Sequence, residues 1–189
     1  MRLFFAITVP SELIEKLTAV QDQLRAEMHD PGIRWTKPEQ FHYTLKFLGE
    51  QPVQRAYTAV EVAQTIARAQ RPFTLTLGGV GAFPNVERPN VIWIGATQGQ
   101  EELVGLARDL DSALARERFR REPKPPKAHL TLARVKSYDA EVAVSARLPR
   151  VTVGEIGSIE VDYMVLMQSI LRPSGAEYTE VERFRFEGP

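Results

Sequence analysis

His42-Tyr43-Thr44-Leu45 and His129-Leu130-Thr131-Leu132 are two copies of one pattern, a His and a Thr separated by one apolar residue. The chain contains three histidines, and two of them lie in these copies. Side chains of a β-strand alternate between its two faces, so a strand through either copy presents His and Thr on one face and apolar residues on the other. The two copies therefore predict two strands that each carry half of one site.

The residues around both copies support strands. Residues 41–48 place His42, Thr44 and Lys46 in alternation with Tyr43, Leu45 and Phe47, and Gly49 ends the run. A second strand is expected over residues 128–135. Both segments are rich in β-branched, aromatic and other apolar residues, and strict alternation favours a half-buried strand.

The rest of the chain alternates between helical and strand patterns. Apolar residues at helical spacing predict helices over residues 11–29, from 53 to before Pro72, and over 103–114. Further strands are expected at residues 3–9, 73–77, 91–94, 151–153, 159–167 and 178–186. Several of these strands alternate cleanly, which favours antiparallel sheets with one open face. No low-complexity linker divides the chain, so residues 1–189 are expected to form one α+β unit.

Composition excludes several classes of chemistry. The chain has no cysteine, which rules out disulfides, thiolate nucleophiles and zinc held by cysteine. Its 24 basic and 24 acidic residues balance, so any nucleic-acid contact has to come from a local patch. The apolar start of the chain is too short for a membrane span and has no cleavage site, and we expect a cytoplasmic protein without membrane contact.

Four other features have a functional and a simpler interpretation. The glycine-rich residues 78–84 lack the endings of known phosphate-binding loops, and a turn is the favoured interpretation. The basic run of residues 116–127 is either a solvated loop or a contact for a polyanion, with Phe119 as a candidate for base stacking. His29 is interpreted as a surface residue at a helix end. A zinc site at His42 and His129 is disfavoured because no further ligand pattern accompanies them.

Two His-x-Thr strands that face each other would form a site for phosphate chemistry. Imidazole has an unperturbed pKa near 6.5, so near neutral pH one ring can accept a proton while the other donates one. On opposite sides of a phosphorus atom, the two rings could activate a water and protonate the leaving oxygen. The threonine hydroxyls could bind the non-bridging phosphate oxygens. This scheme requires no metal ion or other cofactor.

The sequence resembles the 2H phosphoesterase superfamily, and within it the bacterial and archaeal RNA 2′,3′-cyclic phosphodiesterases, historically called 2′-5′ RNA ligases. The resemblance covers nearly the whole chain. It rests on residues 2–7, 34–35, 41–49, 81–84, 91–95 and 129–135, and on the closing Gly175-Ala176-x-Tyr178. Tyr43 departs from the aliphatic residue that is usual there, but it is expected to face the core.

The resemblance implies a bilobal α+β fold, the 2H phosphoesterase fold, with two pseudo-symmetric lobes. Each lobe would have an antiparallel sheet with flanking helices, and the cleft between the lobes would hold one His-x-Thr motif from each. His42 and His129 would be the acid-base pair, and Thr44 and Thr131 would be ligands of the phosphate oxygens. Arg134 matches a family arginine that contacts phosphate.

The expected activity is the opening of a 2′,3′-cyclic phosphate at an RNA or nucleotide end, which leaves a 2′-phosphate. By resemblance His129 would activate the water and His42 would protonate the leaving O3′, and the reverse reaction would join ends through a 2′-5′ linkage. The protein is expected to act as a monomer. Two alternatives remain open at this point, a non-catalytic binder of RNA ends or nucleotides, and an enzyme for another cyclic phosphate such as that of ADP-ribose.

Overall fold

The computed structural model describes all residues from Met1 to Pro189. It combines nine strands, four α-helices and two short 3₁₀-helices. The elements in chain order are β1 (Arg2–Thr8), α1 (Ser11–Glu27), β2 (Ile33–Trp35), η1 (Pro38–Gln40), β3 (His42–Glu50), α2 (Val53–Ala69), β4 (Phe73–Phe83), β5 (Val91–Gln98), α3 (Gln100–Arg116), β6 (Leu130–Val135), α4 (Tyr138–Arg147), η2 (Leu148–Arg150), β7 (Glu155–Val161), β8 (Tyr163–Arg172) and β9 (Gly175–Arg185).

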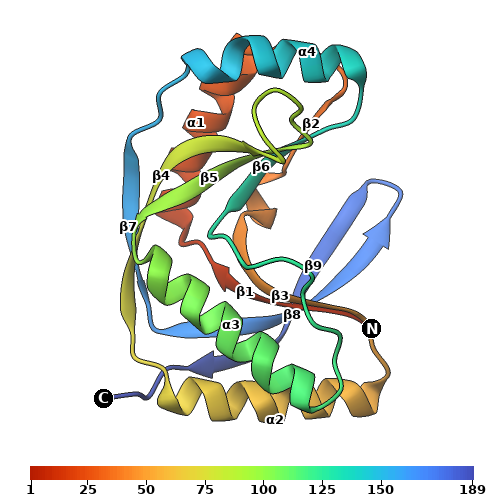
Figure 1. The fold of residues 1–189 in the computed structure, drawn as a ribbon, viewed down its shortest axis with the longest axis vertical. Coiled ribbons are helices and arrows are strands. Elements are labelled where there is room, and N and C mark those ends of the chain that lie inside the picture. The colour runs from red at the N-terminus through yellow and green to blue at the C-terminus, as the bar shows by residue number, and fades with distance from the viewer.

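The strands form one curled antiparallel sheet with two halves (Figure 1). Its order is β7-β4-β5-β6-β3-β1-β8-β9, and β2 adds to β6 as a side branch. The first lobe contains β3, β1, β8 and β9, and the second contains β6, β5, β4 and β7. This arrangement confirms the predicted bilobal α+β fold. One detail differs from the expectation, because hydrogen bonding between β3 and β6 joins the sheets of the two lobes into one.

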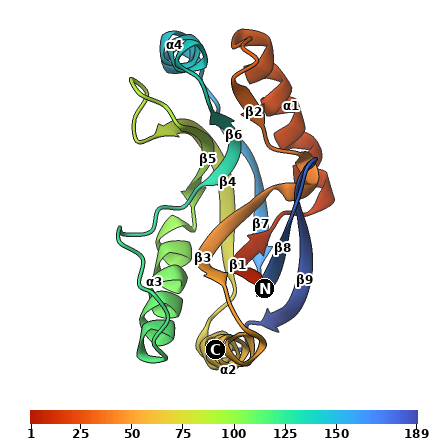
Figure 2. The ribbon, with the colours of Figure 1, turned by 90° about the vertical axis from the view of Figure 1, so that its right-hand side faces the viewer.

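The helices tie the lobes together. α1 follows β1 of the first lobe but packs against β7 of the second, whereas α3 connects β5 and β6 of the second lobe and packs against β3 of the first. α2 packs against α3 and β9. In Figure 2, α1 and α4 lie at one end of the sheet and α2 and α3 at the other. Each lobe therefore packs against a helix that follows a strand of the other lobe.

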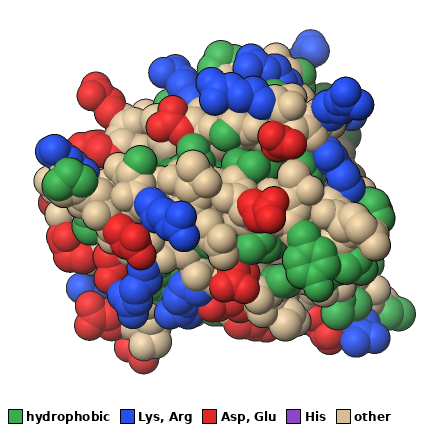
Figure 3. All heavy atoms as spheres, turned by 90° about the horizontal axis from the view of Figure 1, so that it is seen from below, with side chains coloured by type: hydrophobic (Ala, Val, Ile, Leu, Met, Phe, Trp, Pro, Cys, Tyr) green, Lys and Arg blue, Asp and Glu red, His purple; other side chains and the backbone are tan.

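Helical spacing of apolar residues explains how α2 and α3 dock. The buried residues of α3 are Leu103, Leu106, Ala107, Leu110 and Leu114, at steps of one, three and four. The buried residues of α2 are all alanines, at positions 56, 59, 63 and 67. Small side chains let a helix approach its neighbours closely, so α2 can lie directly against α3. On the face seen from below in Figure 3, basic side chains gather along the upper edge, and basic and acidic side chains are mixed over the rest.

Three expectations about where strands begin and end were wrong. Residues 78–84 were expected to form a turn, but β4 continues to Phe83 and pairs with β5 along this stretch. A β-carbon at Gly81 would come within 2.3 Å of the Trp93 ring, so the glycine makes room for a neighbouring strand's indole. The expected strand at 151–153 is irregular, because its contact with β4 is one hydrogen bond from the Gly79 N–H to the Val153 carbonyl.

The third expectation was a single strand over residues 159–167. The structure divides it at Asp162 into β7 and β8. β7 pairs with β4 in the second lobe, whereas β8 pairs with β1 in the first. The chain thus crosses between lobes at this residue, and a continuous apolar pattern cannot reveal such a change of partner.

No helix combines the length and the apolar character that crossing a membrane would require.

Candidate active site

The two His-x-Thr stretches lie side by side where the lobes meet. β3 begins at His42, and β6 begins directly after His129. The register pairs Tyr43 with Leu130, which are the middle residues of the two stretches. Because the strands are antiparallel, this register sets His42 beside Thr131 and Thr44 beside His129. The structure therefore brings the four predicted side chains together.

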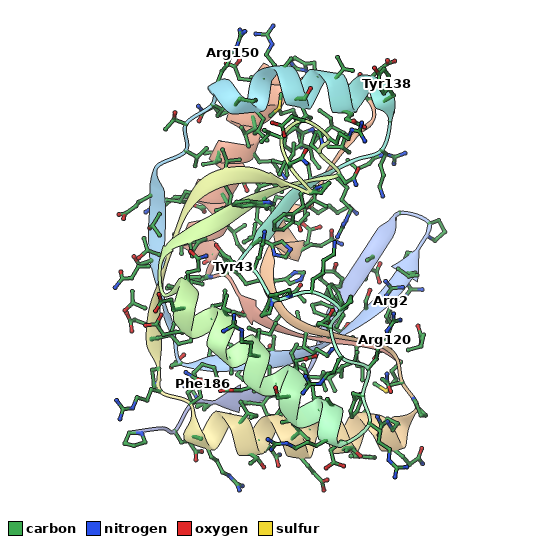
Figure 4. The ribbon with its side chains drawn as sticks, in the orientation of Figure 1. Arg2, Tyr43, Arg120, Tyr138, Arg150 and Phe186 are labelled. Carbon is green, nitrogen blue, oxygen red and sulfur yellow. The ribbon has the colours of Figure 1, made fainter.

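The middle residue Tyr43 anchors the first stretch in the core. Its side chain is 1% exposed, and its hydroxyl donates a hydrogen bond to the Gly95 carbonyl at 2.8 Å. Burial raises the pKa of Tyr43 and keeps the phenol neutral. Figure 4 shows Tyr43 near the centre of the molecule. The expectation that Tyr43 faces the core is thus confirmed.

Each of the two strands contains a β-bulge at the same place in the pattern. The pairing of β3 with β1 passes from Thr44 to Lys46 and leaves Leu45 without a partner. The pairing of β6 with β5 passes from Thr131 to Ala133 and leaves Leu132 without one. A bulge re-aims the side chains that follow it. Phe47 and Arg134, each five residues after its histidine, therefore return to the face that carries the histidines.

The bulge in β3 overturns part of the predicted alternation. Lys46 was expected on the face of His42 and Thr44, but it is 2% exposed and points into the interior. Phe47 was grouped with the core residues, but it is 55% exposed. Its ring lies 5.8 Å from that of Phe4, which in turn lies 5.0 Å from the His42 ring. An exposed ring beside the histidines is a surface on which a base can stack.

The backbone orients both imidazoles in the same way. Nδ1 of His42 lies 2.7 Å from the Gln40 carbonyl, and Nδ1 of His129 lies 2.8 Å from the Lys127 carbonyl. A carbonyl only accepts, so Nδ1 carries the hydrogen, and in the neutral ring Nε2 has a free lone pair. Nε2 of His42 lies 2.8 Å from the Thr44 hydroxyl, which donates to the neutral ring. Nε2 of His129 has no hydrogen-bond partner in the protein.

An aromatic side chain packs against each of the two imidazole rings. Tyr178 of β9 meets the His42 ring edge-on at 5.4 Å, and Phe83 of β4 meets the His129 ring edge-on at 4.9 Å. Both pairs have an interplanar angle of 82°. This packing restricts rotation of the imidazoles, so their Nε2 atoms keep a fixed direction.

Burial lowers the pKa of His42 below its usual 6.5. The Gln40 carbonyl opposes this effect, whereas the charges of His129 and Arg134 add to it. Burial also lowers the pKa of His129, with the Lys127 carbonyl opposing and the Arg134 charge adding to the effect. Arg134 acts on both rings from the face of β6 that also carries His129.

The first prediction concerns the acid limb of the pH profile. Because both pKa values lie below 6.5 in the ligand-free protein, each ring is less than half protonated at the pH where an ordinary histidine is half protonated. We expect the acid limb of kcat/KM to fall below pH 6.5, whichever ring acts as the base. NMR titration of the imidazole resonances checks the same values directly. An acid limb above 6.5 would contradict the burial of the rings.

Tyr178 is a residue of this site that the sequence reasoning did not assign a role. Burial raises its pKa, and the charges of Arg134 and Arg2 oppose that rise. The side chain of Gln40 donates a hydrogen bond to the Ala176 carbonyl, which ties β9 to the start of β3. The only signal in the sequence was the closing Gly175-Ala176-x-Tyr178. Because this stretch is far from His42 in the sequence, the sequence gives no indication that the two residues are in contact.

The basic run of residues 116–127 is partly anchored in the protein. Phe119, the candidate for base stacking, is 6% exposed, and the Arg55 guanidinium lies 3.8 Å from its ring centre. The stacking role predicted for Phe119 is therefore wrong, because the ring is buried and the Arg55 side chain covers it. Arg120 is exposed on the same side of the molecule as Arg2 (Figure 4). Contact of this run with a polyanion stays a prediction.

The third histidine lies apart from the other two. His29 follows the end of α1 and is exposed, as expected for a surface residue. Together with Arg25, Asp30 and Trp35 it lines an open hollow of about 390 Å³ at the connection between α1 and β2. No group of three or more His, Asp or Glu side chains is placed to hold a metal ion.

One protein-family model matches the chain twice, once around each His-x-Thr stretch. The family model described as LigT like Phosphoesterase matches residues 7–93 and again residues 94–178, so each match contains one His-x-Thr stretch. An RNA 2′,3′-cyclic phosphodiesterase of Archaeoglobus fulgidus is 36% identical over 184 residues, which cover 97% of this chain and 99% of that protein.

Two solved structures are similar over nearly the whole chain. The protein TT0787 of Thermus thermophilus is 32% identical with a TM-score of 0.82, and the match covers 100% of this chain and 99% of that one. LigT of E. coli, solved in complex with 3′-AMP, is 29% identical with a TM-score of 0.76, and the match covers 98% and 97%.

Proposed function

Because the chain belongs to the family of LigT-like phosphoesterases, we propose that it hydrolyses 2′,3′-cyclic phosphate ends of RNA or nucleotides to 2′-phosphomonoesters. The observation that carries the proposal is the register of Tyr43 with Leu130, which sets two His-Thr pairs against each other. The name of the Archaeoglobus relative and the 3′-AMP complex of LigT support a nucleotide or RNA ligand.

In the proposed reaction, His129 and His42 move the two protons. Nε2 of His129 takes a proton from water as the water oxygen bonds to phosphorus. The bond from phosphorus to O3′ breaks, and Nε2 of His42, protonated in the substrate complex, gives its proton to O3′. The free lone pair on Nε2 of His129 supports its role as the base. An anionic phosphate raises the pKa of nearby imidazoles, which supports protonation of His42 once substrate is bound.

Thr44, Thr131 and Arg134 bind the phosphate in this proposal. The two hydroxyls lie beside the imidazoles and can donate to non-bridging oxygens, where negative charge accumulates. Arg134 has no carboxylate partner, so its planar guanidinium is available for a two-bond contact with phosphate. Both histidines come from one chain, so the proposed reaction needs no second copy. With the 5′-hydroxyl of a second RNA end in place of water, the same proton transfers would bond O5′ to phosphorus, release O3′ and join the two ends through a 2′-5′ linkage.

The alternative of a non-catalytic binder loses its main support. It relied on the basic run with Phe119 as a stacking residue, and Phe119 is buried. The proposed acid-base groups, in contrast, have oriented Nε2 atoms on a common face.

The second prediction tests the function and the absence of a metal requirement together. A nucleoside 2′,3′-cyclic phosphate is incubated with the protein, with and without excess EDTA, and the product is identified by ³¹P NMR. We expect equal turnover in both samples and a 2′-phosphate as the product. Loss of turnover with EDTA would contradict the metal-independent scheme, and a 3′-phosphate product would contradict the assigned leaving group.

A further inference from the structure

A second arginine lies next to Arg134 on the short strand β2. The register of β2 with β6 pairs Arg34 directly with Arg134, between the pairs Ile33 with Val135 and Trp35 with Ala133. Directly opposed residues of an antiparallel pair share one face, with β-carbons about 4.5–5.5 Å apart. Both arginines are exposed, whereas Ile33 and Ala133 on the other face are buried. Arg34 therefore extends the charged face that Arg134 presents to the histidines.

The two guanidinium groups carry charge that the protein does not compensate. Neither arginine forms an ion pair, although six other ion pairs occur in the chain. Neither side chain makes a hydrogen bond within the protein. Like charges directly opposite each other destabilise a sheet. Two uncompensated guanidinium groups side by side suit the binding of a phosphate-bearing ligand, which supplies the missing negative charge.

The position of β2 is fixed from the interior. The buried side chain of Gln21 in α1 uses one amide nitrogen to donate to two carbonyls, Thr36 at 2.8 Å and Leu132 at 3.0 Å. The backbone N–H of Thr36 also donates to the Leu132 carbonyl at 2.8 Å. These bonds fasten the end of β2 to the bulge of β6. Arg34 is thus held in register with Arg134 by buried hydrogen bonds, as a binding group on a rigid element has to be.

We infer that Arg34 binds the phosphodiester that precedes the cyclic phosphate, so that the site is built for RNA ends rather than for free nucleotides. This inference rests on the proposed function, in which Arg134 binds the cyclic phosphate. A cyclic phosphate carries one negative charge, which matches one guanidinium. The next phosphate along an RNA strand supplies the second charge, and it is the group that a mononucleotide lacks.

The test compares two substrates and one variant, Arg34→Gln. The substrates are a nucleoside 2′,3′-cyclic phosphate and a dinucleotide that ends in a 2′,3′-cyclic phosphate. We expect the ratio of kcat/KM for the dinucleotide to kcat/KM for the mononucleotide to fall about tenfold in the variant, because a charge-assisted phosphate contact is lost. For binding of the dinucleotide 2′-phosphate product, the affinity should depend less on salt in the variant, because one contact between opposite charges is lost.

The controls separate this role from a structural one. Arg150→Gln removes the same charge from an exposed site at the far end of the second lobe (Figure 4) and should leave the ratio unchanged. The thermal midpoint of ligand-free Arg34→Gln should not fall, because the variant removes a repulsion. An unchanged ratio in Arg34→Gln would overturn the inference, whether the variant keeps full activity or loses activity equally on both substrates. Absence of turnover of both substrates by the unmodified protein would instead refute the proposed function.

Discussion

Replacing His42 or His129 with asparagine lowers kcat/KM for a 2′,3′-cyclic phosphate by at least about a hundredfold, the usual minimum contribution of one positioned proton transfer. Asparagine can still donate to the carbonyl of Gln40 or Lys127, which now binds Nδ1, but it cannot move a proton. Because the two rings act on one phosphorus, the double variant should lose little more activity than either single variant. Steady-state kinetics with one substrate measures all three.

The third histidine provides the matched control for these variants. His29 is exposed at the other side of β2, and His29→Asn should keep full activity. Circular dichroism and thermal unfolding establish that each variant is folded. If His42→Asn or His129→Asn retained most of its activity, the two-histidine mechanism would be wrong. A multiplicative loss in the double variant would show instead that the rings act in separate steps.

The second large effect is expected on stability, from the buried ammonium of Lys46. Its Nζ lies 2.8 Å from Asp111, 3.2 Å from Glu122 and 2.7 Å from the Arg120 carbonyl. Lys46→Met fills a similar volume but leaves two neighbouring carboxylates without their shared cation. We expect the free energy of unfolding to fall by about 3 kcal/mol, the lower end of the range for a broken buried pair, because both carboxylates retain contact with water.

The pH dependence of this loss identifies its cause. Burial acts to raise the pKa of Asp111. The pKa nevertheless lies below its usual range, because the carboxylate accepts hydrogen bonds from Lys46 and the Glu122 N–H and lies near the charges of Lys46 and Arg121. A carboxyl with a lowered pKa stabilises the fold above its unfolded pKa, and this contribution disappears as the pH falls through the folded value. The difference between Lys46→Met and the unmodified protein in urea unfolding should therefore shrink in acid.

A matched control for Lys46 lies on the segment that it anchors. Lys124 is exposed and has no ion pair, so Lys124→Met should change the unfolding free energy by less than about 0.5 kcal/mol. Equal stability of Lys46→Met and Lys124→Met would contradict the role of Lys46. The same ion pairs fix residues 120–122, shortly before His129, so we also expect Lys46→Met to lower kcat beyond the effect of Lys124→Met.

Local and repeated signals in the sequence predicted the two His-x-Thr strands, whereas the bilobal fold was expected from the resemblance to the 2H phosphoesterases. Alternation over a few residues identifies a strand, and two copies of one pattern in one chain indicate two related strands. The predicted alternation failed at Lys46 and Phe47 because a bulge inserts one extra residue into the strand. This insertion leaves no mark on the types of residue in the sequence. In the sequence, an unpaired Leu45 looks the same as a paired one.

Other features depended on contacts between distant parts of the chain. The alignment of Arg34 with Arg134 and the packing of Tyr178 on His42 are set by strand pairing, which a single sequence does not display. Phe119 was misjudged for a related reason, since Arg55 of α2 covers its ring. The sequence therefore predicted the histidines, the threonines and Arg134, whereas the contacts of Arg34, Tyr178 and Phe119 required the structure.

The order of strands in the sheet also determines when the site can form during synthesis. Along the chain β1 precedes every other strand of the sheet, yet one of its two neighbours is β8, and Arg2 pairs with Ser169. Pairings so distant in sequence make folding slow, because the intervening chain must be ordered before the contact forms. The last strand, β9, then delivers Tyr178 against His42. The ribosome must therefore release the chain as far as Tyr178 before His42 acquires its final surroundings.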